Sequence, residues 1–282
     1  MNPDAAGGEG AKAKENADVP LPAWQPFTFG GVAAFADARF GRVFAFLLVS
    51  ALIVALTVVW FLRVFYAPVL LQAMRNMPET ARITNGVLEG ISEPVIAESK
   101  LLALAATPKS SEQIGQGADL QIQFRPGDVC ANSIIWPNRG FEFEYERGGY
   151  LNLARSNLEP WWGAWHPVVY TGIGVEVFLQ MMITWILLGT IYMIPARFIG
   201  FYMDRDLTFG GAWRLSTIGL LPGAMMMVGS IILYAWGVLD LVGLSFFAAL
   251  HFVVGWVYFI GGVWKRKRIF PKTKGNPFAS GK

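Results

Sequence analysis

Residues 43–62 read VFAFLLVSALIVALTVVWFL, a stretch of twenty residues without a charged side chain. As a helix that rises 1.5 Å per residue, the stretch is about 30 Å long, which matches the hydrocarbon core of a bilayer. Aromatic side chains at Trp60, Phe61, Phe65 and Tyr66 follow at its end, as they do at many membrane–water interfaces. The sequence therefore predicts a membrane-spanning helix over residues 43–66.

Three similar stretches lie nearer the C-terminus. They cover residues 168–196, 215–238 and 241–264, and Pro195 with Arg197 is expected to end the first of them. Only Leu239 and Asp240 separate the last two, so we expect these to form a tight antiparallel hairpin. The fold class predicted is an all-α membrane bundle of four helices.

The composition agrees with a membrane location and disfavours several functions. Of the 282 residues, 54% are hydrophobic and 15% charged, which is too apolar for an ordinary soluble domain. One cysteine, Cys130, and two histidines, His166 and His251, are too few for a disulfide or for a multi-histidine metal or haem site. Common catalytic and nucleotide-binding motifs do not occur. We therefore predict a non-catalytic protein without cofactor or metal.

Polar segments flank the predicted spans. Residues 1–26 lack an apolar period and predict a disordered tail, whereas residues 27–42 mix Phe with small and charged residues, as interfacial amphipathic segments do. Residues 197–214 form a loop and residues 265–282 a basic tail. Residues 39–42, this loop and this tail are short segments that carry basic residues, whereas the turn at Leu239–Asp240 has none, so we expect the three segments and both termini in the cytoplasm.

Residues 67–166 separate the first two spans and read as a small α+β domain, mainly antiparallel β. A short helix is expected first, then a hairpin around Asn85–Gly86 and strands within residues 119–125, 129–136, 141–147 and 150–154. Alternation predicts one buried face that includes Phe141, Phe143 and Tyr145. The carboxylates between them suit either a solvated face or a cation or basic partner. Four spans place this domain outside the cytoplasm.

Polar residues inside the spans are candidates for function, because an unpaired charge in lipid costs a few kcal/mol. Glu176 and His251 are expected at similar depths, with Gln180 one helical turn from Glu176, and together they form a candidate intramembrane polar site. A carboxylate–imidazole pair would relay a proton or bind a cation. The alternative is that Glu176 faces water or a backbone, and that His251 bonds to a serine.

Two further sets of residues suggest contacts. Gly219 and Gly223 have the GxxxG spacing that permits close helix packing, within the chain or with a partner, and Pro222 predicts a kink between them. A basic run directly after the last span favours contacts with anionic lipid headgroups over nucleic acid. Its members are Lys265, Arg266, Lys267 and Arg268.

Two sequence patterns remain open to more than one interpretation. Residues 28–31 and 208–211 both read TFGG, which fits a duplicated unit, as in some transporters, a chance repeat, or a shared need for a flexible kink at the membrane surface. Residues 159–166, EPWWGAWH, fit an aromatic belt at the outer interface or a platform for a ligand.

The order of these segments resembles a group of uncharacterised bacterial inner-membrane proteins, some of them encoded beside maltodextrin-utilisation systems. The likeness lies in the Phe-rich lead-in, one span, a β domain opening with residues 83–88 (ITNGVL), and three spans with Leu221–Pro222 in the third. It implies a location in the bacterial inner membrane and an accessory role, and it brings no catalytic residues.

Two functions from different classes follow. The first is a non-catalytic accessory, scaffold or assembly subunit of a membrane complex, whose partners are lipids and other membrane or periplasmic subunits. The second is a small oligomeric transporter or lipid-handling protein that uses Glu176 and His251.

Overall fold

The computed structural model describes residues 24–109 and 117–269, so most of the predicted tail 1–26 and the end of the basic tail lie outside the described residues. The chain divides into two compact units. The helical unit consists of the described parts of Met1–Ser50, Met181–Met226 and Ala249–Lys282. The β unit consists of the described parts of Ala51–Gln180 and Met227–Ala248, and it holds every strand found in the described residues.

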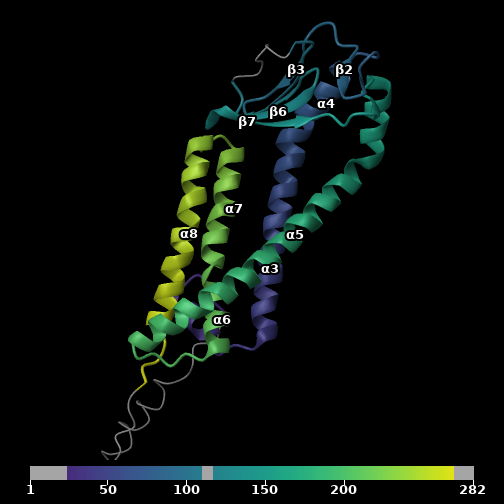
Figure 1. The fold of residues 1–282 in the computed structure, drawn as a ribbon. Coiled ribbons are helices and arrows are strands. Elements are labelled where there is room, and N and C mark those ends of the chain that lie inside the picture. Colours follow the sequence, from purple (N-terminus) through teal and green to yellow (C-terminus); the bar gives the residue numbers. More distant parts are fainter. Residues whose placement is uncertain (1–23, 110–116, 270–282) are drawn as a thin grey trace, which may run out of the picture. The chain divides into compact units, whose positions relative to one another are not determined.

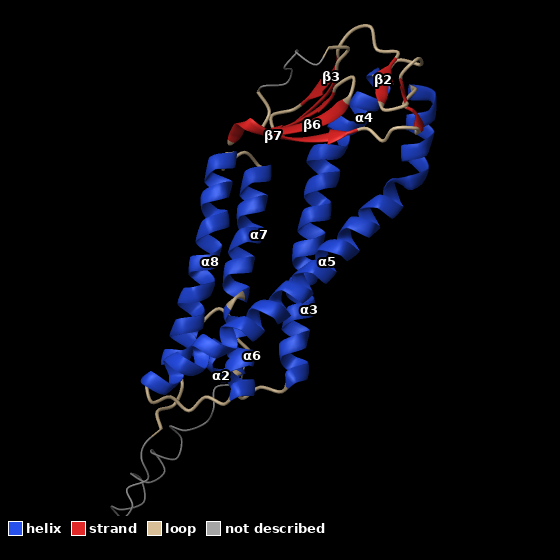
Figure 2. Cartoon of the chain, in the orientation of Figure 1, coloured by secondary structure: helices blue, strands red, loops and turns tan. Residues whose placement is uncertain are grey.

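Four helical stretches in the described part of the chain are long and apolar enough to cross a membrane. They are Phe40–Asn76, Arg155–Tyr202, Phe209–Ala235 and Leu241–Trp264 (Figure 1). The prediction of four apolar helices is therefore confirmed, and the strands fall between the first and second of them (Figure 2). A four-helix bundle and an external position of the β domain stay predictions.

The first apolar helix changes geometry where its apolar stretch ends. Helix α3 (Phe40–Phe61) passes through the π-helical turn η3 (Leu62–Tyr66) into α4 (Ala67–Asn76). Pro68 lacks the N–H that would bond to the carbonyl of Val64, and a local π turn is one way in which a helix accommodates such a loss. Helix α4 thus continues α3 toward the strands.

The second apolar helix is longer than its predicted span. Helix α5 (Arg155–Tyr202) has 48 residues, about 72 Å of helix, whereas the sequence predicts residues 168–196. The expectation that Pro195 and Arg197 end the helix is wrong, because a proline removes one hydrogen bond but keeps a helical φ. The Trp-rich segment also belongs to α5, so the last strand is followed directly by helix.

The third apolar stretch is interrupted beside Pro222. Helix α6 (Phe209–Gly219) ends before Leu220, and α7 (Leu221–Ala235) begins after it. Pro222 lies in the first turn of α7, where a missing N–H breaks no helical bond, and the predicted kink stays a prediction. A turn with Gly237 at φ +72° leads to α8 (Leu241–Trp264), where the backbone N–H of Gly243 donates to Asp240 Oδ1 at 2.7 Å.

The two TFGG segments both begin a helix. Thr28 caps α2 (Phe29–Phe35) and Thr208 caps α6, because each hydroxyl accepts from the N–H of the second glycine, at 3.0 and 3.1 Å. A hydroxyl at this position satisfies a backbone donor that the helix leaves free. The two helices pack on each other. A shared capping geometry thus accounts for the repeated threonine, and common descent stays a prediction.

The strands form two sheets. A three-stranded antiparallel sheet has the order β2-β1-β8, and a five-stranded sheet has the order β3-β4-β5-β6-β7. The first contains β1 (Arg82–Thr84), β2 (Val87–Glu89) and β8 (Tyr150–Asn152). The second contains β3 (Val95–Glu98), β4 (Leu102–Ala106), β5 (Leu120–Phe124), β6 (Asp128–Ser133) and β7 (Trp136–Glu144). Positive φ angles at Asn85 and Gly86 close the predicted hairpin of β1 and β2.

Strands β3 and β4 were missed by the sequence interpretation. Strand β4 reads LALAA and is buried at every residue, so it shows no alternation and consists of residues that favour helices. It pairs in parallel with β5, whereas the other pairs in this sheet are antiparallel. The connection between β4 and β5 is long enough for the crossover that a parallel pair requires.

The predicted buried face of β7 is wrong at two of its three residues. Phe141 and Phe143 are 66% and 61% exposed, because α4 covers the sheet at β3 and β4 while β7 forms the opposite edge. Tyr145 is partly buried and donates its hydroxyl to the carbonyl of Arg125 at 3.0 Å. Burial, with the charge of Asp128, raises the pKa of Tyr145, so the hydroxyl keeps its proton.

Within the β unit, a buried hydrogen bond joins α7 to the residue that precedes β5. The Tyr234 hydroxyl donates to Asp119 Oδ2 at 2.7 Å, and both residues are less than a tenth exposed. Neither residue stands out in the sequence, because Asp119 comes just before a strand and Tyr234 is one of many aromatic residues. Removing the hydroxyl leaves a buried carboxylate oxygen without this donor.

We expect Tyr234→Phe to lower the free energy of unfolding by about 1–3 kcal/mol, the usual cost of an unsatisfied buried polar group. Thermal unfolding in a fixed detergent measures the change. Tyr150→Phe, at an exposed tyrosine of β8, is the control and should leave the midpoint unchanged. Equal midpoints for Tyr234→Phe and the wild type would show that the bond contributes nothing.

Candidate functional site

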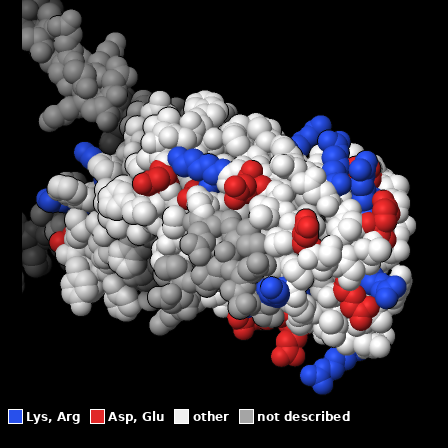
Figure 3. Space-filling view, turned by 90° about the horizontal axis from the view of Figure 1, so that it is seen from above, with Lys and Arg blue, Asp and Glu red and all other residues white. Residues whose placement is uncertain are grey.

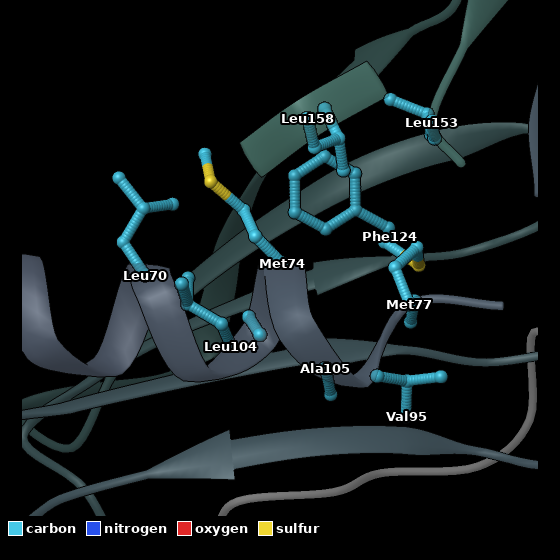
Figure 4. A pocket seen from close by; sticks show the side chains of 11 residues that line it. Leu70, Met74, Met77, Val95, Leu104, Ala105, Phe124, Leu153 and Leu158 are labelled. Atoms are coloured by element: carbon cyan, nitrogen blue, oxygen red, sulfur yellow. The ribbon is translucent and has the colours of Figure 1, made fainter. Parts of the chain in front are cut away.

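An apolar cavity of about 120 Å³ lies in the β unit between α4 and the five-stranded sheet (Figure 4). Helix α4, the strands β3 to β5 and the start of α5 provide its walls. The lining side chains are apolar at every position. They are Leu70, Ala73, Met74, Met77, Val95, Leu104, Ala105, Ala106, Phe124, Leu153 and Leu158.

The cavity lies between two hydrophobic clusters of the domain that do not fill the space between them. One cluster includes Leu102 and Leu104, against which Leu70 and Ala73 of α4 pack. The other includes Ala106 and Leu153, against which Met77 and Phe124 pack. Both clusters contribute to the wall, so the cavity lies between two parts of the hydrophobic core of the domain.

The chemistry of the wall limits what the cavity accepts. No lining side chain carries a charge or a hydrogen-bonding group, so a sugar, nucleotide or peptide would lose its bonds to water without compensation. Hydrocarbon meets no such cost. Met74 and Met77 add flexible, polarisable side chains that adapt to irregular apolar shapes. At roughly 24 cal/mol per Å³, filling such a volume with hydrocarbon is worth about 3 kcal/mol.

His166, in the Trp-rich start of α5, has a structural role. Pro167 has no N–H to donate to the carbonyl of Gly163, four residues earlier in the helix. The His166 Nδ1 atom lies 3.2 Å from that carbonyl oxygen and 3.1 Å from the carbonyl oxygen of Trp162. The imidazole thus takes the place of the missing backbone donor.

The candidate intramembrane polar residues lie on different units. Glu176 and Gln180 are exposed on the part of α5 that belongs to the β unit. His251 belongs to the helical unit, where its ring lies 3.9 Å from that of Phe252 between centroids. A Glu176–His251 pair therefore stays a prediction.

Gly219 and Gly223 both face α8 inside the helical unit. A Cβ atom on Gly219 would lie 3.0 Å from Cα of Phe259, and one on Gly223 would overlap the backbone carbonyl oxygen of His251. Glycine at these positions therefore lets the backbones of α6, α7 and α8 approach closely. The contact lies within the chain.

We expect Gly223→Ala to destabilise the helical unit by about 1–3 kcal/mol, because the added methyl group must displace the backbone of α8. Gly229→Ala is a matched control, since Gly229 lies in the same helix and a Cβ there meets no atom within 4 Å. Thermal unfolding should separate the two variants. A lower midpoint for both would instead indicate a general effect of alanine in α7.

The basic run after α8 contains residues with different roles. Arg266 forms two hydrogen bonds with the Asp37 carboxylate, at 2.6 and 3.1 Å, and further bonds with the carbonyl oxygens of Asp206 and Ala33, at 3.0 and 3.3 Å. Its side chain is only 10% exposed. Arg266 thus joins α2, the loop after α5 and the end of α8, whereas Lys265 and Arg268 line a separate cavity.

Acidic and basic side chains are interspersed on the face of the molecule that Figure 3 shows, so this face has no large patch of one charge. On β7, Glu142 pairs with Arg125 at 3.3 Å, so this carboxylate already has a cationic partner. Within residues 24–109 and 117–269, no group of three or more His, Cys, Asp or Glu side chains is placed to hold a metal ion.

Comparisons with protein-family models, with curated proteins and with solved structures give no match for this chain. The resemblance to the maltodextrin-linked membrane proteins therefore stays a prediction.

Proposed function

We propose that this protein is a non-catalytic, lipid-handling membrane protein that holds a hydrocarbon chain in the cavity between α4 and the sheet. The observation that carries the proposal is the cavity wall, which is apolar at every lining residue. A lipid acyl chain is the abundant molecule that fits such a wall, because hydrocarbon requires no hydrogen-bonding partner.

The position of the cavity along the chain supports a lipid as the source. Leu70 lies eight residues beyond Leu62, the last residue of the apolar stretch 43–62. Eight residues of helix span about 12 Å. Leu158, on the opposite wall, is close to the start of α5, the next helix long and apolar enough to cross a membrane. Both helices lead from the cavity into apolar spans, so an acyl chain has a short path from the bilayer.

A photoreactive lipid tests this proposal. The wild-type protein is placed in liposomes that contain phosphatidylcholine with a diazirine at the end of one acyl chain, and labelled peptides are mapped by mass spectrometry after irradiation. We expect labels on the α4 and β5 peptides that contain Met74 and Phe124, besides those on the spans.

Ala73→Leu should reduce labelling of α4 and β5 several-fold, because an isobutyl group replaces a methyl group in the wall of a cavity of about 120 Å³. Gln72→Leu introduces the same side chain one residue earlier, at an exposed position that does not line the cavity, and should leave the pattern unchanged. Labels confined to the spans of the wild-type protein would refute acyl-chain binding.

The edge strand β7 favours a second function, that of an accessory subunit which binds another protein. Phe141 and Phe143 point to the same side of this strand and are both more than half exposed. The strand has a neighbour on one side only in the described sheet, so its outer edge offers free backbone donors and acceptors. Exposed aromatic residues beside a free edge are typical of strand-addition interfaces.

For this second function, we expect Phe141→Ser with Phe143→Ser to abolish a specific crosslinked complex in native membranes, because the apolar contact is lost. Glu144→Gln, on the other side of the same strand, is the control and should retain the complex. Crosslinking in the native host followed by mass spectrometry gives the result. A complex that is unchanged in the Phe variant would assign the interface to another surface.

A further inference from the structure

A second cavity, of about 610 Å³, lies in the helical unit and differs from the first in chemistry. Three cationic side chains line it together with two aromatic rings and a glycine. The cationic residues are Arg205, Lys265 and Arg268, and the others are Phe29, Gly261 and Trp264. They come from the start of α2, the segment after α5 and the end of α8, so the fold assembles the cavity from distant parts of the sequence.

A short backbone pairing sets the two arginines opposite each other. Arg205 and Arg268 form an antiparallel bridge. On either side of it, the N–H of Ile269 donates to the carbonyl of Asp204 at 2.7 Å, and the N–H of Asp206 donates to the carbonyl of Lys267 at 2.9 Å. Like charges directly opposite in such a pairing repel each other, and an anion between them removes the repulsion.

The described protein does not supply that anion. Among residues 24–109 and 117–269, no ion pair joins Arg205, Lys265 or Arg268 to a carboxylate. Arg205 donates from Nη1 to the carbonyl of Arg266 at 2.7 Å, while its Nε is buried without a hydrogen-bond partner in this part of the structure. The nearby Asp37 carboxylate is bound to Arg266.

The aromatic residues indicate the kind of anion. Trp264 is the last residue of α8, the end of an apolar helix, and is 62% exposed. Phe29 lies so close to Gly261 that a Cβ on this glycine would be 2.6 Å from Cδ1 of the ring, so Gly261 makes room for the ring at the cavity. Aromatic rings at the end of an apolar helix are typical of the lipid headgroup region.

We propose that this cavity binds the phosphate group of an anionic phospholipid, with Arg205, Lys265 and Arg268 as its cationic partners and with Phe29 and Trp264 beside the glycerol and the first carbons of the chains. Guanidinium groups suit phosphate because several N–H donors lie in one plane. The site lies in the helical unit, whereas the apolar cavity lies in the β unit, and it recognises another part of a lipid. Its test is therefore independent of the test of the proposed function.

Native mass spectrometry of the detergent-purified full chain tests the site, with phosphatidylglycerol and phosphatidylcholine added separately as probes. We expect the wild type to retain phosphatidylglycerol in preference to phosphatidylcholine. Lys265→Gln with Arg268→Gln should weaken phosphatidylglycerol binding roughly tenfold or more, since each basic contact to an anionic lipid contributes about one kcal/mol. Arg39→Gln removes an exposed charge from the same unit outside the cavity and should leave binding unchanged.

Two further arms keep the test decisive. Lys265→Gln alone leaves the Arg205–Arg268 pairing intact and should still weaken binding, so it replaces the double variant if that protein fails to fold. Inorganic phosphate is the second probe. Thermal stabilisation by phosphate with no further effect of phosphatidylglycerol would overturn the lipid assignment in favour of a free ion. Equal retention of the two lipids, or equal losses in Arg39→Gln and the cavity variants, would overturn the site.

Discussion

A helix has to satisfy its backbone donors and acceptors within the chain, most strictly in hydrocarbon, where no water replaces a missing partner, and this constraint shapes the long apolar helices of this protein. Its apolar stretches are helices, and each irregularity has a local compensation. The π turn beside Pro68 absorbs a lost hydrogen bond, the His166 ring takes the place of the donor missing at Pro167, and Pro222 lies where its lack of an N–H costs nothing. The same constraint makes the polar residues of the apolar helices notable.

The apolar helices could be predicted because hydropathy over some twenty residues is a strong signal, and the hairpin at Asn85–Gly86 because its turn demands positive φ angles. The helical start of α5 could not be predicted in this way. Its residues 155–166 are polar and aromatic, and helical structure there depends on continuation from the apolar part. Strand β4 was missed because complete burial removes the alternation by which strands are recognised.

The candidate sites likewise contain residues that the sequence could predict and residues that it could not. A run of four basic residues looks uniform in sequence, yet Arg266 is bound to Asp37 while Lys265 and Arg268 face a cavity with Arg205, a residue sixty positions away. Only tertiary structure brings these residues together. The apolar cavity likewise could not be predicted from the sequence, because its wall consists of ordinary core residues from two helices and several strands. A gap between two hydrophobic clusters leaves no mark in the order of residues.

The continuity of α3, η3 and α4 has a mechanical consequence. Apolar helices tilt to match the thickness of the bilayer around them. Helix α4 extends the first apolar helix and forms one wall of the apolar cavity, so a tilt of this continuous helix is transmitted to the domain that contains the cavity. In the proposed function, the cavity that holds the acyl chain therefore shares one continuous helical stretch with a candidate membrane span.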